Sequence, residues 1–200
     1  MNLKQDELIL AVKKDIILPK NLAWQGLQIN NSEKILDLIN NNQDFLLRSC
    51  LETDPNYKQI ISYMIFKHKN KYFLTQRKSS ASEQRLKNKY SLGIGGHIKK
   101  EDVNSNSAFD WTLREFEEEI FYDGNLKIST IGFLNDDSNA VGQVHLGMVL
   151  LLEGDSPNIQ IKSELKSGTL TTLAECQMLY KNMESWSQIV LDFLLKESLL

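Results

Sequence analysis

The chain has only two cysteines among its 200 residues, a small net charge and no long hydrophobic run. Cys50 and Cys176 are far apart and lack the spacing of metal ligands, so we expect reduced thiols, not a disulfide. No apolar run approaches the ~18 residues that a membrane-spanning helix needs. Residues 1–7 lack the continuous apolar core of a signal peptide. Together these absences predict a cytoplasmic protein that does not span a membrane.

The net charge of −3 gives no electrostatic reason to expect a long nucleic-acid duplex as a partner. A hydrophobic content of 42% and a charged content of 24% are ordinary for a globular protein. The chain is long enough to bury a sizeable core in one domain. We therefore predict a single domain over residues 1–200. An extension (1–55) packs on a core (56–182), and a C-terminal helix (183–200) completes it.

The order of the expected elements predicts an α+β fold, in which a mixed β-sheet lies between helices. Alternating or continuous apolar residues indicate strands, and apolar residues at helical spacing indicate helices. Strands are expected over 8–12, 16–18, 59–66, 72–76, 90–98, 126–134, 144–152, 159–162 and 169–172. Helices are expected over 32–39, 107–119, 173–181 and 184–197, the first of them capped by Ser32.

An acidic run at the end of the second expected helix is the most informative segment. Glu115, Glu118 and Glu119 occur at i, i+3 and i+4, so they share one helix face. Carboxylates so close together repel one another unless a cation neutralises them. Mg²⁺ prefers such oxygen ligands and leaves coordination positions for substrate phosphates. Arg114 lies four residues before Glu118 and can brace the cluster, although a solvated charged face is the alternative interpretation.

Two adjacent glycines stand upstream of this helix, at the end of an expected strand. Glycine lets the backbone turn sharply and approach another group closely, so Gly95 and Gly96 predict a bend. A strand, a glycine bend and an acidic helix together can offer a backbone carbonyl and several carboxylates to one ligand.

Gly96, a loop and residues 114–119 resemble the Nudix box. That pattern is Gly, five residues, Glu, seven residues, then Arg-Glu-aliphatic-x-Glu-Glu-x-Gly-aliphatic. A wider likeness to a bacterial branch of Nudix hydrolases, or MutT-type phosphoesterases, covers roughly half the chain. It is carried by residues 54–59, 93–98, 135–139 and 141–147.

The resemblance implies a Nudix-like αβα sandwich and a metal-dependent hydrolase. Its substrate would be a small-molecule diphosphate, a nucleoside diphosphate linked to another moiety, cleaved at the phosphoanhydride bond. Glu115, Glu118, Glu119 and the Gly96 carbonyl would bind Mg²⁺ or Mn²⁺, and Arg114 completes the catalytic set. A homodimer is also expected. Two alternatives remain, an isoprenoid-diphosphate isomerase-like enzyme and a catalytically weakened Nudix domain that binds nucleotide ligands.

The loop before the acidic helix departs from the pattern. Residues 97–113 number seventeen where the pattern has thirteen. Counted back from the arginine, the expected Glu falls on Asn106, which cannot ionise. We predict that Glu101, Asp102 or Asp110 supplies a carboxylate in its place, and that a bracing contact with the arginine suits Asp110 best.

The helix end departs from the pattern as well, because Phe121 replaces the expected Gly. Gly124 is a candidate for a delayed helix stop, since glycine accepts the left-handed conformation at little cost.

Several residues outside the box are candidates for substrate contacts. Arg77 and Arg85 lie in a basic stretch before the glycine strand and could hold phosphate oxygens, or simply be solvated. His97 follows the glycines and could contact phosphate or metal-bound water, or pack locally. His145 is expected to be a hydrogen-bonded core histidine. Glu164 follows a strand and is a candidate acceptor for the proton of the attacking water.

Overall fold

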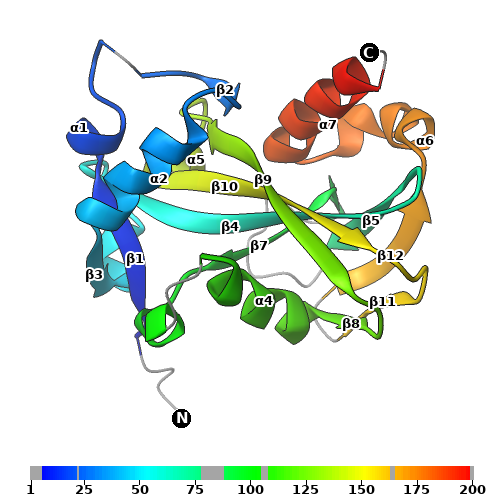
Figure 1. Cartoon of the computed structure of the whole chain (residues 1–200). Coiled ribbons are helices and arrows are strands. Elements are labelled where there is room, and N and C mark those ends of the chain that lie inside the picture. The colour runs from blue at the N-terminus through cyan, green and yellow to red at the C-terminus, as the bar shows by residue number, and fades with distance from the viewer. Residues whose placement is uncertain (1–5, 22, 78–87, 105–107, 163–164, 199–200) are drawn as a thin grey trace.

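The computed structural model describes residues 6–21, 23–77, 88–104, 108–162 and 165–198. A ten-stranded sheet lies at its centre, with helices on both faces (Figure 1). The sheet contains β1 (Leu8–Lys13), β2 (Gly26–Gln28), β3 (Asp44–Leu47), β4 (Tyr57–His68), β5 (Lys71–Arg77), β6 (Tyr90–Ser91), β7 (Gly93–His97), β9 (Leu126–Asn135), β10 (His145–Gly154) and β12 (Leu165–Thr171). A second, two-stranded sheet joins β8 (Ile120–Tyr122) and β11 (Ile159–Ile161).

The long strand β4 organises the main sheet, because it pairs along its whole length. It runs parallel to β10 on one edge, where Ile61 lies opposite Gly147. On the other edge it pairs antiparallel with β1, β7 and β5 in succession. The sheet is therefore mixed, and β7 is held beside the centre of β4, with Ser62 opposite Gly96.

Helices cover the two faces of this sheet in separate layers. They are α1 (Lys14–Ile17), α2 (Ser32–Asn41), α3 (Arg48–Leu51), α4 (Ala108–Glu119), α5 (Ala140–Val144), α6 (Leu173–Met178) and α7 (Ser185–Glu197), with the 3-10 turns η2 (Lys100–Asn104) and η3 (Tyr180–Asn182). Ile39 of α2 and Phe116 of α4 join one apolar core, whereas Cys176 of α6 and Val190 of α7 join another. Figure 1 shows α4 and α7 on opposite sides of the sheet, and the predicted α+β sandwich is confirmed.

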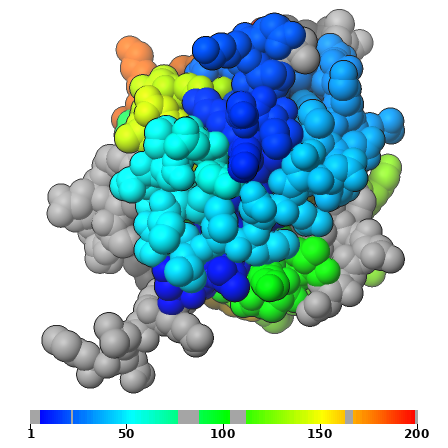
Figure 2. All heavy atoms as spheres, turned by 90° about the vertical axis from the view of Figure 1, so that its left-hand side faces the viewer, coloured from blue at the N-terminus to red at the C-terminus, as the bar shows by residue number. Residues whose placement is uncertain are grey.

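The N-terminal residues contribute strands to the main sheet. β1 pairs with both β3 and β4, and β2 extends the far edge by pairing with β9. In Figure 2 the N-terminal segments, coloured blue to cyan, cover most of the face turned to the viewer. Among the described residues, no helix has the length and apolar character that a membrane crossing requires.

Three local predictions were wrong. Residues 16–18 were expected as a strand but belong to α1 and its end, because a short apolar run does not distinguish a buried helix from a strand. Ser32 is the first residue of α2 and Asn31 is the N-cap, while the Ser32 hydroxyl donates to the Ile29 carbonyl at 3.0 Å. Gly124 does not stop α4, since that helix ends at Glu119 and continues directly into β8.

Candidate active site

The side chain of Glu115 lies against the backbone of Gly96. A Cβ placed on Gly96 would come within 2.3 Å of the Glu115 carboxyl carbon, so no larger residue fits there without a shift. The Gly96 carbonyl also accepts a hydrogen bond from Ser62 Oγ at 3.3 Å. Glycine is needed here for close approach, as the sequence suggested, and the approach brings a carboxylate against the backbone of Gly96.

Glu115 is more buried than Glu118, with 14% of its side chain exposed against 54%. Burial raises the pKa of this carboxyl, and the neighbouring Arg114 only partly opposes that effect. A carboxylate that burial disfavours in its charged form is stabilised by any further cation that reaches it. The position is therefore suited to a positively charged ligand.

Arg114 lies at the centre of the acidic cluster. Its Nε and NH2 groups donate to the two Asp102 oxygens at 2.5 and 2.8 Å. Its remaining contacts are Glu118 Oε1 at 2.7 Å, Glu115 Oε1 at 2.9 Å and the His97 carbonyl at 3.3 Å. A planar guanidinium with five donors can make this set of contacts, whereas a lysine cannot. Arg114 thus braces the cluster as its spacing from Glu118 predicted.

Asp102 occupies the acidic position of the box when the pattern is counted forward from Gly96. Five residues, 97–101, separate the two, as in the pattern, and the four extra residues therefore follow Asp102. Its side chain is 4% exposed, and it also accepts a hydrogen bond from Lys99 N at 2.8 Å. A count back from Arg114 passes through the four inserted residues and therefore ends at Asn106, four positions after Asp102. Asn106 lies outside the described residues. Asp102 makes a bracing contact with Arg114. The bracing contact expected of Asp110 stays a prediction, because the side chain of that residue is not described.

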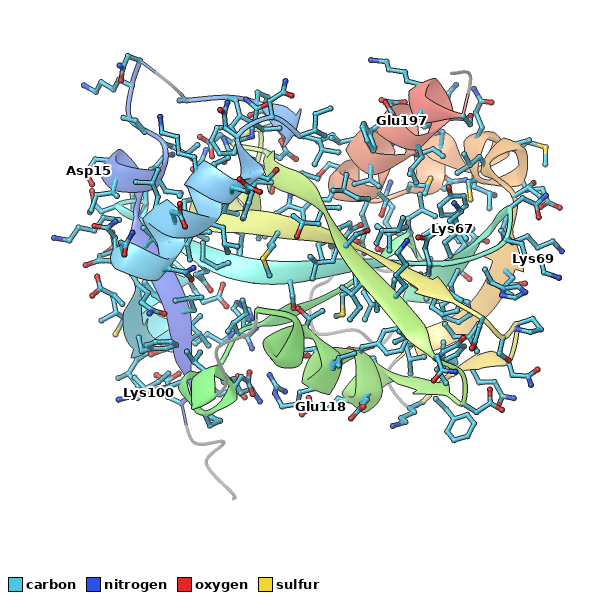
Figure 3. The ribbon with its side chains drawn as sticks, in the orientation of Figure 1. Asp15, Lys67, Lys69, Lys100, Glu118 and Glu197 are labelled. Atoms are coloured by element: carbon cyan, nitrogen blue, oxygen red, sulfur yellow. The ribbon has the colours of Figure 1, made fainter. Side chains whose placement is uncertain are left out.

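The three glutamates share α4 but do not converge on one point. No group of three His, Cys, Asp or Glu side chains in the described ranges is arranged to hold a metal ion. Glu118 is paired with Arg114 and 54% exposed, and Figure 3 shows it along the outer edge of α4. The donor set nevertheless fits a hard divalent cation chemically, since it consists of carboxylates and the Gly96 carbonyl.

A cavity of about 180 Å³ lies on the opposite face of β7. Gly95, Gly96 and His97 form one side of it, and the strands β4 and β10 form its floor. Three short segments complete the wall: α3, the loop with α5, and the first turn of α7. The lining side chains include Arg48, Glu52, Asn139, His145, Glu184 and Trp186. Sequence reasoning singled out only His97 and His145 among the polar ones.

His97 links the two faces of β7. Its carbonyl accepts from Arg114 on the α4 side, while its ring lines the cavity, with Nε2 2.8 Å from Gln59 Oε1. Burial and, secondarily, Arg48 lower the pKa of His97 to about 3, so the ring is neutral at ordinary pH. His145 is a buried, hydrogen-bonded histidine as predicted, with Nδ1 2.7 Å from the Val141 carbonyl. It also lines the cavity, with its ring 5.5 Å from that of His97.

Lys58 positions the α5 wall of the cavity, and sequence reasoning assigned it no role. The side chain is fully buried, and Nζ donates to Asp137 Oδ1 and the Gly142 carbonyl, both at 2.6 Å, and to the His145 carbonyl at 3.2 Å. Burial lowers the pKa of Lys58 although Asp137 opposes it. A lysine in an otherwise apolar strand was the available signal, because a buried charge needs specific partners.

Buried hydroxyl groups hold the first turn of α7 in place. Tyr63 OH lies 2.7 Å from Ser187 Oγ, which in turn accepts a hydrogen bond from Leu92 N at 3.0 Å. Burial raises the pKa of Tyr63 to about 12. The Tyr63 ring also meets the edge of Trp186 at 5.4 Å, and Trp186 packs on Gly147, where a Cβ would approach its ring to 2.8 Å. Trp186 is therefore fixed at the cavity by two strands.

Three other predicted positions lie where the structure gives no side-chain description. Arg85 and Glu164 fall outside the described residues. The backbone of Arg77 ends β5, but its side chain is not described. Their proposed contacts with phosphate or water stay predictions.

Comparison with known proteins adds the family. No protein-family model matches the chain. Protein YmaB of Bacillus subtilis is 34% identical to it, and the match covers 96% of this chain and 98% of YmaB. Tm1382, a protein assigned to the Nudix hydrolases, is 27% identical with a TM-score of 0.78, over 95% of this chain and 99% of Tm1382.

A more distant structure shares only the fold. The Nudix domain of Shewanella oneidensis NrtR, solved with ADP ribose, has a TM-score of 0.55 and 15% identity, over 72% of this chain and 89% of that one. Full-length likeness to YmaB and Tm1382, on a sandwich that places an acidic helix against a glycine strand, shows that the chain belongs to the Nudix hydrolase family, a family of pyrophosphohydrolases.

Proposed function

We propose that the protein is a divalent-metal-dependent hydrolase that cleaves the phosphoanhydride bond of a nucleoside diphosphate linked to another moiety. The observation that carries the proposal is the buried Glu115 carboxylate beside the Gly96 backbone, with Glu118 and Glu119 on the same helix. Mg²⁺ or Mn²⁺ would be held by these three glutamates and the Gly96 carbonyl. When bound, the ion would neutralise the phosphate oxygens and orient a water for attack.

The protein's own residues supply the rest of the arrangement. Arg114 would keep Glu115 and Glu118 on one side of α4, and Asp102 would keep Arg114 in place. A glutamate that is not occupied by the ion would accept the proton of the water. The water oxygen would add to one phosphorus, and the bond between that phosphorus and the bridging oxygen would break. The leaving phosphate would depart with the bridging oxygen.

The reaction class is tested by hydrolysis in heavy-oxygen water. Nucleoside diphosphate derivatives are incubated with the protein and Mg²⁺ or Mn²⁺, and the products are analysed by mass. We expect cleavage only with metal, and label on a phosphate product. An isomerised diphosphate without cleavage would instead support the isomerase-like alternative.

A catalytically weakened, ligand-binding domain is the second candidate, because the three glutamates do not converge in the described structure. It predicts nucleotide binding without metal-dependent turnover, which the same incubation separates from hydrolysis. A homodimer stays a prediction, to be checked by sedimentation.

A further inference from the structure

The cavity on the α7 side of β7 has no part in the proposed metal chemistry. Gly96 borders it, and the same residue meets Glu115 on the opposite face. A molecule whose diphosphate lies at Gly96 could therefore place a second group in the cavity. The volume of about 180 Å³ is small beside the ~300–1,000 Å³ of pockets for drug-sized ligands, so the cavity suits one ring system.

The charges that line the cavity disfavour a phosphate there. Arg48 is positive, whereas Glu52 and Glu184 are negative. The guanidinium already donates to Glu52 Oε1 at 3.1 Å and to Glu7 Oε2 at 3.4 Å. Carboxylates thus outnumber cations on this wall, and they accept hydrogen bonds but cannot donate them when ionised. The cavity favours a neutral group that carries N–H donors.

The apolar part of the wall suits a flat ring. Trp186 and Tyr63 line the cavity and fix each other through an edge contact at 5.4 Å. Aromatic side chains attract other rings through stacked or edge-on contacts.

The side-chain amide of Gln59 lies behind the His97 ring and has one group without a hydrogen-bond partner among the described residues. Gln59 is fully buried and binds His97 through Oε1. Its Nε2 has no hydrogen-bond partner among the described residues. Gln59 does not itself line the cavity, but its hydrogen bond holds the His97 ring that does.

From these features we propose that the cavity binds the amino-bearing nucleobase of the substrate, with Trp186 against the ring and Glu52 or Glu184 accepting from its exocyclic amino group. The proposal rests on the proposed function only in taking a nucleotide as substrate. Adenine, guanine and cytosine carry this amino group. Uracil and hypoxanthine present a carbonyl in its place, which a carboxylate repels. Losing one such hydrogen bond and leaving its partner unmet costs about tenfold or more in affinity.

Matched nucleosides test the proposal without metal or turnover. Calorimetry on the full chain compares cytidine with uridine and adenosine with inosine. In each pair the amino group is replaced by a carbonyl, and the adjacent ring nitrogen changes from an acceptor to an N–H donor. Ribose 5-phosphate serves as a probe without a base. We expect the amino-bearing member of each pair to bind at least about tenfold more tightly, and ribose 5-phosphate to bind more weakly than either.

Variants assign the effect to the cavity. Trp186→Ala should weaken cytidine binding about tenfold or more, and Trp186→Phe, which keeps a ring, should weaken it less. Combining Glu52→Gln with Glu184→Gln should remove most of the preference for cytidine over uridine. Met178→Ala, at a side chain that is 79% exposed and does not line the cavity, should bind cytidine as the unaltered protein does.

Equal binding within each pair, or a preference for ribose 5-phosphate, would overturn this inference. A preference for cytidine that Trp186→Ala and the double glutamine variant leave unchanged would overturn it too. These outcomes are separable from the fate of the proposed function. Turnover without base preference refutes the base pocket alone, and base preference without metal-dependent turnover refutes hydrolysis alone.

Discussion

The two faces of β7 differ in kind although the same short strand forms both. On the α4 side, Arg114 is surrounded by Asp102, Glu115 and Glu118. On the α7 side, neutral His97 stands beside aromatic side chains and a cavity. Successive residues of a strand point to opposite faces, so the Cβ direction of Gly96 faces Glu115 on the charged side, while the His97 ring faces the cavity on the other. One strand can therefore separate the groups suited to phosphate chemistry from the groups suited to recognition.

The comparison predicts that the chemical step depends on the charged side. Glu115→Gln should lower turnover by ~10²–10⁴-fold, because the variant keeps the shape of the buried side chain and removes its charge. The measurement is the initial rate of phosphate release with saturating Mg²⁺. Glu117→Gln, at an exposed position of the same helix, is the matched control and should retain its rate. Equal losses in both variants would mean that the helix face has no special role.

On the cavity side, Lys58 is expected to contribute to folding stability and not to the chemical step. Lys58→Met should lower the free energy of unfolding by ~3 kcal/mol. The variant leaves the buried Gly142 and His145 carbonyls without the Nζ donor and removes the ion pair between Lys58 and Asp137. Urea unfolding measures this change. Lys67→Met, which removes a partly exposed pair with Glu153 at 3.7 Å, should cost under about 1 kcal/mol. Similar losses for both lysines would contradict the role given to Lys58.

Asp102 tests whether Arg114 needs its brace. Asp102→Asn should lower the free energy of unfolding by about 2 kcal/mol, since it weakens a buried, two-point contact with a charged partner. Asp102→Glu keeps the charge and has the residue type of the box, so it should retain more turnover than Asp102→Asn does. Glu101→Gln changes an exposed neighbour and should have little effect. Greater harm from the Glu101 variant would show that the insertion had been placed on the wrong side of Asp102.

His97 gives the smallest expected effect, a pH dependence of stability. Its folded-state pKa of about 3 lies below the ordinary histidine value near 6.5. The unfolded chain therefore binds more protons between those values, and stability should fall as the pH drops through about 6.5 toward 3. Unfolding at pH 7 and pH 5 should show this loss, and His97→Gln should reduce it. An unchanged pH dependence in the variant would mean that other groups cause it.

The sequence predicted the acidic helix and the glycine strand because their signals are local. Helical spacing places Glu115, Glu118 and Glu119 on one face, and adjacent glycines mark a close approach. The Asp102 contact was reached only as one of three options, because an insertion breaks the count from one end of the motif. Folding brings the loop back to Arg114 and places Asp102 against its guanidinium.

The cavity could not be predicted from the sequence in the same way. Its lining comes from segments separated by more than a hundred residues, such as Arg48 and Trp186, and neither belongs to a motif. The pairing of β1 with β4 and the hydrogen bond between Tyr63 and Ser187 bring those segments together. Such contacts depend on tertiary packing, which local spacing does not encode.

The divalent-metal site on α4 is the central claim, and calorimetric titration of Mn²⁺ into the full chain tests it most directly. The unaltered protein should bind the ion, and Glu118→Gln combined with Glu119→Gln should weaken binding at least about tenfold, because two of the proposed oxygen ligands lose their charge. Glu117→Gln should bind like the unaltered protein. Binding that persists unchanged in the double variant, or that is lost equally in the Glu117 control, would contradict the assignment of the metal to this helix face.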